Sequence, residues 1–294
     1  MQLYGIIPPL VTPFDAEERV DEQALRGEVR YLIERARVHG LAVGGSTGEG
    51  HTLNTDELRA LVAWAVEEAR GRVPLIAGVI ADSTRGAIER GRAVADLGVA
   101  ALQVTPVHYL FRPDDDSMLR HFGAVADATG LPVIIYNVVP WAYLSPQFLA
   151  RVLREVEGVI GVKQSAGDLK TLADLLLVAG ERARIFSAVD ALLYPSFCLG
   201  AHGAIAAIPT AAPEWCVALW EAVQRGDHGR ALELHRRLLR LWNAIDGPNL
   251  PANVKTAMAL QGRAGGRVRA PMHETSPAQR DRIREALLPP PPIP

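Results

Sequence analysis

The chain has 294 residues, of which 49% are hydrophobic and 22% charged, and its formal net charge is −2. This composition is that of a globular protein, so collagen-like, coiled-coil and disordered chains are excluded. No surplus of positive charge is present to neutralise phosphates, so we expect no nucleic-acid partner. No run of about 18 apolar residues occurs, so the sequence predicts no membrane span and no membrane partner.

The basic residues are unevenly divided, with 28 arginines and only three lysines, Lys163, Lys170 and Lys255. Arginine supplies positive charge nearly everywhere, which raises the question of what each retained lysine does. The two cysteines, Cys198 and Cys216, lie in apolar helical surroundings and are predicted to be buried free thiols. The first 13 residues show no basic segment followed by an apolar one, so we expect a cytoplasmic protein.

In chain order, short apolar runs alternate eight times with segments of helical periodicity. The segment Glu57–Arg70 illustrates the helical pattern, because its apolar residues fall on one face. Capping residues support three helix starts, at Asp56, at Ser83 and at Ser145. The predicted strands are Gly5–Val11, Gly40–Gly44, Pro74–Ile80, Ala100–Thr105, Pro132–Tyr136, Val159–Lys163, Arg184–Ala188 and Gly203–Ile208.

Buried parallel strands that alternate with amphipathic helices predict a sheet covered by helices, and eight such units predict a closed (β/α)₈ TIM barrel. A doubly wound open sheet is the alternative, but it normally has a glycine-rich phosphate loop where this chain has prolines. We therefore divide the chain into a barrel, residues 1–212, and a helical extension packed on it, residues 213–294, as one structural unit. The helices expected in the extension are Trp215–Arg225, Gly229–Ala244, Val254–Gln261 and Pro277–Leu288, followed by a frayed Pro289–Pro294.

In a TIM barrel the chemistry lies at the carboxyl ends of the strands. Lys163 ends the sixth predicted strand, where burial disfavours its ammonium form and favours a nucleophilic amine. Tyr136 ends the neighbouring strand, and its phenol beside such an amine can carry protons to and from a carbon atom. The structural alternatives are a lysine that reaches solvent and a tyrosine that merely finds a buried partner.

Other polar residues follow the remaining strands. The turn Gly44–Glu49 exposes backbone amides and the hydroxyls of Ser46 and Thr47, which suit a small carboxylate. His108 and Tyr109 follow the fourth strand. Asp190 follows the seventh. The eight histidines are dispersed and lack the spacing of metal ligands, so we expect no metal.

Four segments resemble the dihydrodipicolinate synthase/N-acetylneuraminate lyase family over essentially the whole chain. They are Gly45-Ser46-Thr47-Gly48-Glu49, Tyr136-Asn137, Gly161 to Asp168 and Gly200 to Ile205. The resemblance implies a class I aldolase or lyase that acts on a 2-oxo acid such as pyruvate and on an aldehyde. It implies no cofactor beyond the covalent imine. It also implies a homotetramer built as a dimer of dimers.

Carried onto this chain, the resemblance makes Lys163 the imine-forming residue, Tyr136 the proton donor and acceptor, and Ser46 its relay partner. Thr47 and the backbone at Ile205 would then hold the carboxylate of the 2-oxo acid. His108, Tyr109 and Asp190 are further candidates for substrate binding.

The chain departs from the pattern of the family in two places. After Tyr136 it lacks the arginine that binds the carboxylate of the aldehyde in true dihydrodipicolinate synthases. Instead of a Tyr-Tyr pair after the fourth strand it has His108-Tyr109, either of which would have to serve the relay. Four aromatic residues either line a rather apolar second-substrate pocket or pack at a subunit interface or in the core; they are Trp141, Tyr143, Tyr109 and Phe111. Genuine dihydrodipicolinate synthase activity and a non-catalytic barrel that binds 2-oxo acids remain the alternatives.

Overall fold

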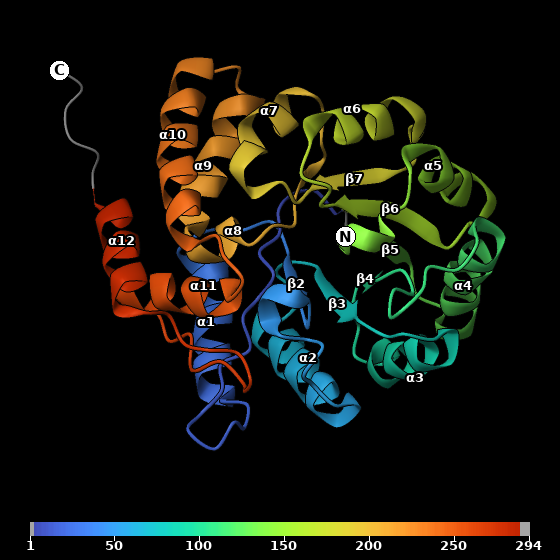
Figure 1. Ribbon diagram of the computed structural model, residues 1–294, viewed down its shortest axis with the longest axis horizontal. Coiled ribbons are helices and arrows are strands. Elements are labelled where there is room, and N and C mark those ends of the chain that lie inside the picture. Colours follow the sequence, from blue (N-terminus) through green and yellow to red (C-terminus); the bar gives the residue numbers. More distant parts are fainter. Residues whose placement is uncertain (1–2, 289–294) are drawn as a thin grey trace.

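The computed structural model describes residues 3–288, and its centre is a sheet of eight parallel strands (Figure 1). From β2 to β8 each strand pairs with the next one in sequence, and β1 pairs with β8. The strands are β1 (Gly5–Ile6), β2 (Leu41–Val43), β3 (Leu75–Val79), β4 (Ala101–Val104), β5 (Val133–Asn137), β6 (Val159–Gln164), β7 (Arg184–Ser187) and β8 (Gly203–Ala204).

The sheet closes on itself between the first and second strand segments. The amide of Leu10 donates to the carbonyl of Ala42 at 2.8 Å, and the amide of Ala42 donates to the carbonyl of Pro8 at 3.0 Å. The predicted (β/α)₈ barrel is thus confirmed. The first strand is shorter than predicted, because Pro8 and Pro9 have no N–H to donate to a ladder.

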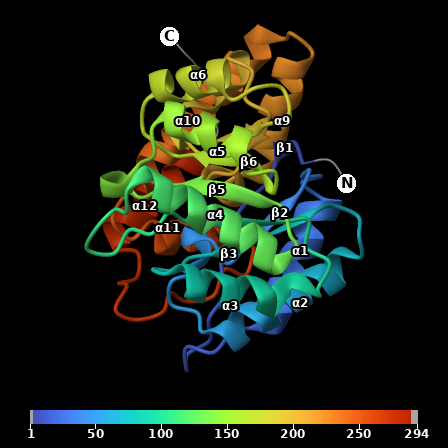
Figure 2. The same cartoon turned by 90° about the vertical axis from the view of Figure 1, so that its right-hand side faces the viewer.

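Helices surround the barrel, as both views of the ribbon show (Figures 1 and 2). The longer helices over the barrel are α1 (Glu22–Glu34), α2 (Thr55–Ala69), α3 (Thr84–Ala95), α4 (Asp115–Thr129), α5 (Pro146–Glu155) and α6 (Leu169–Val178). Shorter ones are α7 (Leu193–Cys198), α8 (Ile208–Ala211) and the 3-10 turns η1 (Ser46–Gly48), η2 (Pro140–Ala142) and η3 (Asp190–Leu192).

The helix starts follow from capping side chains. Ser83 and Ser145 cap α3 and α5 as predicted, since their hydroxyls accept backbone N–H groups of the first turn. Asp56 does not cap α2. Asn54 does, in a capping box with Glu57, and Asp56 lies in the first turn, where a carboxylate is favoured by the helix dipole.

The helices that follow the barrel are α9 (Pro213–Gln224), α10 (His228–Ile245), α11 (Leu250–Leu260) and α12 (Pro277–Leu287). In Figure 1 they form the orange and red group beside α1 and α8. Helix α11 packs against both α8 and η1, so this group reaches the carboxyl-terminal face of the barrel. None of the helices within the described range is long and apolar enough to cross a membrane. The tail Pro289–Pro294 lies outside the described residues.

Apolar side chains fill the barrel interior below its carboxyl-terminal mouth. Ile7, Ile76, Ile134 and Phe186 form part of this plug and are fully buried. Among the cysteines, Cys216 is buried as predicted, but the prediction was wrong for Cys198, which is the exposed last residue of α7.

Candidate active site

Lys163 and Tyr136 lie side by side at the mouth of the barrel. They are directly paired in the register of β5 and β6, and their side chains are 3% and 2% exposed. The Nζ atom of Lys163 lies 3.9 Å from the centroid of the Tyr136 ring. Side chains of paired residues on parallel strands project to the same face, which explains why these two meet.

Ser46 joins this pair from the second strand-to-helix loop. The hydroxyl of Tyr136 donates a hydrogen bond of 3.0 Å to Ser46 Oγ. Ser46 and Thr47 open the 3-10 turn η1, where N–H groups have no partner inside the helix and can bind an anion. A Cβ atom at Gly48 would come within 2.5 Å of the carbonyl of Leu10, so only glycine allows the turn to pack this closely.

A cavity of about 600 Å³ opens above these residues. Its polar lining includes Ser46, Thr47, Tyr136, Lys163 and Asp190. Tyr143, Ser165 and Gly167 also line it, and the apolar part of the wall consists of Val138, Pro140, Ala188, Val189, Ala191, Ala206, Ala207, Trp242, Leu250 and Pro251. Lys163 is the sole basic side chain of this cavity lining, and Asp246 adds a second carboxylate at its rim.

Asp190 is held in the wall by the start of α8. Its Oδ1 atom accepts a hydrogen bond of 2.6 Å from the amide of Ile208. Burial raises the pKa of Asp190 to about 6, although this bond and the nearby Lys163 act in the opposite direction. The carboxyl group can therefore change its charge near neutral pH.

The loop after β5 is pinned by side-chain hydrogen bonds. Asn137 Nδ2 donates to Gln164 Oε1 at 2.9 Å and to the carbonyl of Leu144 at 3.1 Å. The hydroxyl of Tyr143 donates to the carbonyl of Ser165 at 3.1 Å, and burial raises the pKa of Tyr143. These bonds fix the wall formed by residues 138–143.

Three predicted site residues lie apart from the cavity wall. Ile205 points into the apolar plug, and its amide donates to the carbonyl of Ser187 at 3.0 Å. Tyr109 is 65% exposed. His108 contacts the carbonyl of Pro106 through Nδ1 and lies 3.6 Å from Asp82 Oδ1 through Nε2. Within this single chain, His108 and Tyr109 therefore do not reach the hydroxyl of Tyr136.

The structure also adds residues that sequence reasoning missed. Trp242 and Leu250 bring the extension into the cavity wall. Glu49 is fully buried next to η1 and forms an ion pair with Lys255, with Nζ to Oε1 at 2.6 Å. The scarcity of lysine was a signal for Lys255, but its partner is 206 residues away in the chain. Within residues 3–288 no group of three or more His, Cys, Asp or Glu side chains is placed to hold a metal ion.

Comparison with known proteins identifies the family of the whole chain. The family model of the dihydrodipicolinate synthetase family matches residues 2–288. The chain belongs to the dihydrodipicolinate synthetase family. The predicted enzyme class, a Schiff-base aldolase or lyase, is confirmed with it. The 4-hydroxy-tetrahydrodipicolinate synthase of Thermomicrobium roseum is 38% identical over 288 residues, which cover 97% of this chain and 94% of that protein.

Solved structures of the dihydrodipicolinate synthetase family agree with the fold. Dihydrodipicolinate synthase from Aquifex aeolicus superposes with a TM-score of 0.91 at 29% identity and covers 97% of both chains. A prophage protein of this family from E. coli K12, solved in complex with pyruvate, gives a TM-score of 0.92 at 27% identity over 98% of both chains.

Proposed function

We propose that this protein is a 2-oxo acid aldolase or lyase that works through an imine on Lys163, with pyruvate as the simplest substrate. The observation that carries the proposal is the contact of Lys163, Tyr136 and Ser46 at the bottom of one cavity. A buried amine, a phenol and a hydroxyl are the groups that such chemistry needs. The pyruvate bound to the prophage relative gives independent support.

The proposed reaction begins when Nζ of Lys163 adds to the carbonyl carbon of the 2-oxo acid and water leaves, which forms a protonated imine. The imine withdraws electrons, so Tyr136 can take a proton from the adjacent methyl group and leave an enamine. The enamine carbon attacks the aldehyde carbon, and the aldehyde oxygen receives the proton that Tyr136 took from the methyl group. Hydrolysis then frees the lysine, and cleavage runs the same steps in reverse. The imine is the electron sink, so no metal or organic cofactor is needed.

The substrate carboxylate is proposed to bind at η1. The amides of Ser46 and Thr47 lie in the first turn of this helix, and the hydroxyl of Thr47 lines the cavity beside them. The amide of Ile205 is bonded to Ser187, so the Thr47 side is the better anchor. Asp190 stands in the wall as a polar contact for the remainder of the substrate.

We further propose that the second substrate is uncharged and rather apolar. The lining contains no arginine or histidine, and Lys163 is consumed by the imine. Asp190 and Asp246 would repel an anionic aldehyde, and most of the remaining wall is apolar.

Genuine dihydrodipicolinate synthase activity is the second candidate. It is favoured by curated relatives of that name, including one from Methanopyrus kandleri that is 35% identical over 97% of this chain. An efficient condensation of pyruvate with aspartate semialdehyde would establish it in spite of the missing arginine.

The surroundings of the site support a homotetramer in the cytoplasm. Tyr109, Leu110, Phe111 and Trp141 are 65%, 87%, 66% and 73% exposed, and the indole of Trp141 donates to the carbonyl of His108 at 3.0 Å. Clustered large apolar side chains mark protein interfaces, and a second copy of the chain would cover them. The free thiols of Cys198 and Cys216 suit a reducing compartment.

The test of this function is reductive trapping. Incubation with pyruvate and borohydride should attach one pyruvate-derived group to Lys163, and Lys163→Arg should abolish the adduct because guanidinium forms no imine. An unmodified protein, or labelling elsewhere, would overturn the mechanism. Trapping without exchange of the pyruvate methyl protons in deuterated water would instead favour a non-catalytic barrel that binds 2-oxo acids.

A further inference from the structure

The turn that carries Ser46 and Thr47 is held from behind by a buried ion pair. Glu49 ends this turn in a left-handed conformation with φ of 54°, and it does not belong to the cavity lining. Its Oε1 atom accepts from Lys255 Nζ at 2.6 Å, and its Oε2 atom accepts from the amide of Arg269 at 2.9 Å. Both carboxylate oxygens therefore bind the C-terminal extension.

Lys255 is fixed as firmly as Glu49. Its ammonium donates to Glu49 and to the carbonyl of Arg267, and Nζ lies 4.9 Å from the centroid of the Phe14 ring. Lys255 lies on α11, is only 4% exposed, and thus joins three segments that are remote in sequence. The amide of Arg267 also donates to the carbonyl of Phe14 at 2.8 Å, which fastens the segment after α11 to the first loop.

Arg269 completes the attachment on the outer side of the turn. Its guanidinium donates to Glu57 Oε1 at 2.7 Å and to the carbonyl of Thr52 at 2.9 Å. From the barrel side, Thr12 Oγ1 donates to the carbonyl of Gly48 at 2.6 Å. The turn is consequently held on both sides. On the side that faces away from the barrel, the contacts come from residues 255–269.

We propose that Lys255 is a positioning residue, which acts through Glu49 to set the place of Ser46 and Thr47 against Tyr136 and the substrate carboxylate. This inference rests on the proposed function for its kinetic consequences. The geometry gives it a reason: a buried carboxylate that loses its cation must find another partner or reach water, and either movement displaces the turn. A displacement of about 1 Å can reduce a rate by about 100-fold.

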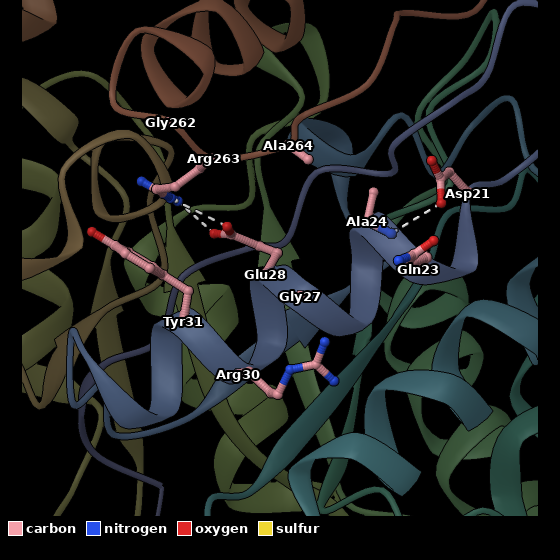
Figure 3. A pocket seen from close by; sticks show the side chains of 10 residues that line it. All are labelled: Asp21, Gln23, Ala24, Gly27, Glu28, Arg30, Tyr31, Gly262, Arg263 and Ala264. Atoms are coloured by element: carbon pink, nitrogen blue, oxygen red, sulfur yellow. Dashed lines mark hydrogen bonds and ion pairs between the residues drawn. The ribbon is translucent and has the colours of Figure 1, made fainter.

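The chain offers a matched control in a second buried ion pair of the same extension. Figure 3 shows Arg263 facing Glu28 of α1, and the two side chains are 3% and 4% exposed. Arg263 also donates to the carbonyls of Thr210 and Ala211. This pair borders a different cavity, of about 450 Å³, none of whose lining residues lies in the cavity above Lys163.

The experiment compares Lys255→Met with Arg263→Met in the full-length protein. Both variants leave a buried carboxylate without its cation and should lower the melting temperature. In Lys255→Met, backbone hydrogen exchange in residues 44–50 should accelerate, the pyruvate concentration for half-maximal trapping should rise about tenfold, and methyl-proton exchange at saturating pyruvate should fall about 100-fold. The rate of trapping at saturation should change less than threefold, because Lys163 lies on β6.

Arg263→Met should keep wild-type pyruvate binding, methyl-proton exchange and hydrogen exchange in residues 44–50. Equal effects of the two variants, or a destabilised Lys255→Met with unchanged residues 44–50, would overturn the proposal. If Lys255→Met does not fold, two variants replace it: Glu49→Gln alone, and the double variant that combines Glu49→Gln with Lys255→Met. Glu28→Gln is then the matched control. The hydrogen-exchange readout needs no substrate, so it separates a failure of this inference from a failure of the proposed function, which would already show in the wild-type protein.

Discussion

The hydroxyl of Tyr136 is 3.0 Å from Ser46 Oγ, although 90 residues separate the two in the chain. Nζ of Lys163 lies over the ring of the same phenol, so one tyrosine connects the amine to the η1 turn. In the proposed reaction, a proton would pass between the carbon next to the imine and the Ser46 hydroxyl through this single side chain.

Removal of that phenol should separate imine formation from carbon chemistry. In Tyr136→Phe the apolar ring remains beside Lys163, so pyruvate should still be trapped by borohydride. Exchange of the methyl protons should fall by about 10² to 10⁴, which is the usual contribution of a general acid–base residue. NMR in deuterated water measures this exchange.

Ser46→Ala serves as the graded comparison for Tyr136→Phe. It removes the relay hydroxyl but leaves the phenol, so we expect a loss of about tenfold in the same exchange. A Ser46→Ala variant as inactive as Tyr136→Phe would assign the proton transfer to the serine instead.

The carboxyl group of Asp190 should make a contribution to the free energy of unfolding that decreases as pH rises. Its pKa is raised by burial from 3.8 to about 6. The folded protein therefore binds this proton more tightly than the unfolded chain, and stability is lost between about pH 4 and pH 6. The upper limit is about 3 kcal/mol, since water in the cavity screens the carboxyl. In urea unfolding, the stability of Asp190→Asn relative to wild type should increase across this range; a constant difference would contradict the assignment.

The imidazole of His121 should make a contribution to stability that increases as pH rises, over nearly the same pH range as for Asp190. It is 3% exposed on α4, its Nδ1 atom lies 3.0 Å from Thr84 Oγ1, and burial lowers its pKa from 6.5 to about 4. The unfolded chain binds this proton more tightly, so stability is present above pH 6.5 and is lost toward pH 4, by up to about 3 kcal/mol. His121→Gln should lose stability at pH 7 but lose less on acidification. Identical slopes in His121→Gln and wild type would refute this.

The sequence was sufficient for most of the architecture because strands and helices leave periodic patterns. It also predicted that Lys163 and Tyr136 meet, because residues that end neighbouring parallel strands lie at one edge. It did not reveal the Glu49–Lys255 pair, which depends on how α11 packs against η1. Nor did it show that Ile205 faces the apolar plug, since a one-residue change of register reverses the face. The exposure of Cys198 was missed for a similar reason, because the end of a short helix has no clear periodicity.

The two cysteines should differ sharply in reactivity. Cys198 is exposed, whereas Cys216 is fully buried on α9, and burial raises the pKa of its thiol. In the native protein a thiol reagent should modify Cys198 alone, and Cys198→Ser should abolish this rapid reaction. Modification of Cys216 should require denaturant. Two rapidly reacting thiols in native buffer would show that α9 opens readily.

The charge of the cavity should decide which aldehyde is accepted. Apart from Lys163, the lining has no basic side chain, and Asp246 lies exposed at its rim beside Asp190. With pyruvate as the donor, benzaldehyde should therefore be condensed with a higher kcat/KM than aspartate semialdehyde. For an aldehyde with a net negative charge, such as succinic semialdehyde, Asp246→Lys should raise kcat/KM about fivefold, because it exchanges repulsion for attraction, and it should leave the value for benzaldehyde unchanged.

Asp127→Lys provides the matched control for this charge effect, since Asp127 is an exposed carboxylate on α4 outside the cavity lining. It changes the net charge by the same amount but lies outside the cavity lining, so it should change kcat/KM for neither aldehyde. If wild-type protein already prefers aspartate semialdehyde, the apolar second substrate is refuted and dihydrodipicolinate synthase activity takes its place. If Asp127→Lys and Asp246→Lys act alike, the preference reflects overall charge rather than the cavity.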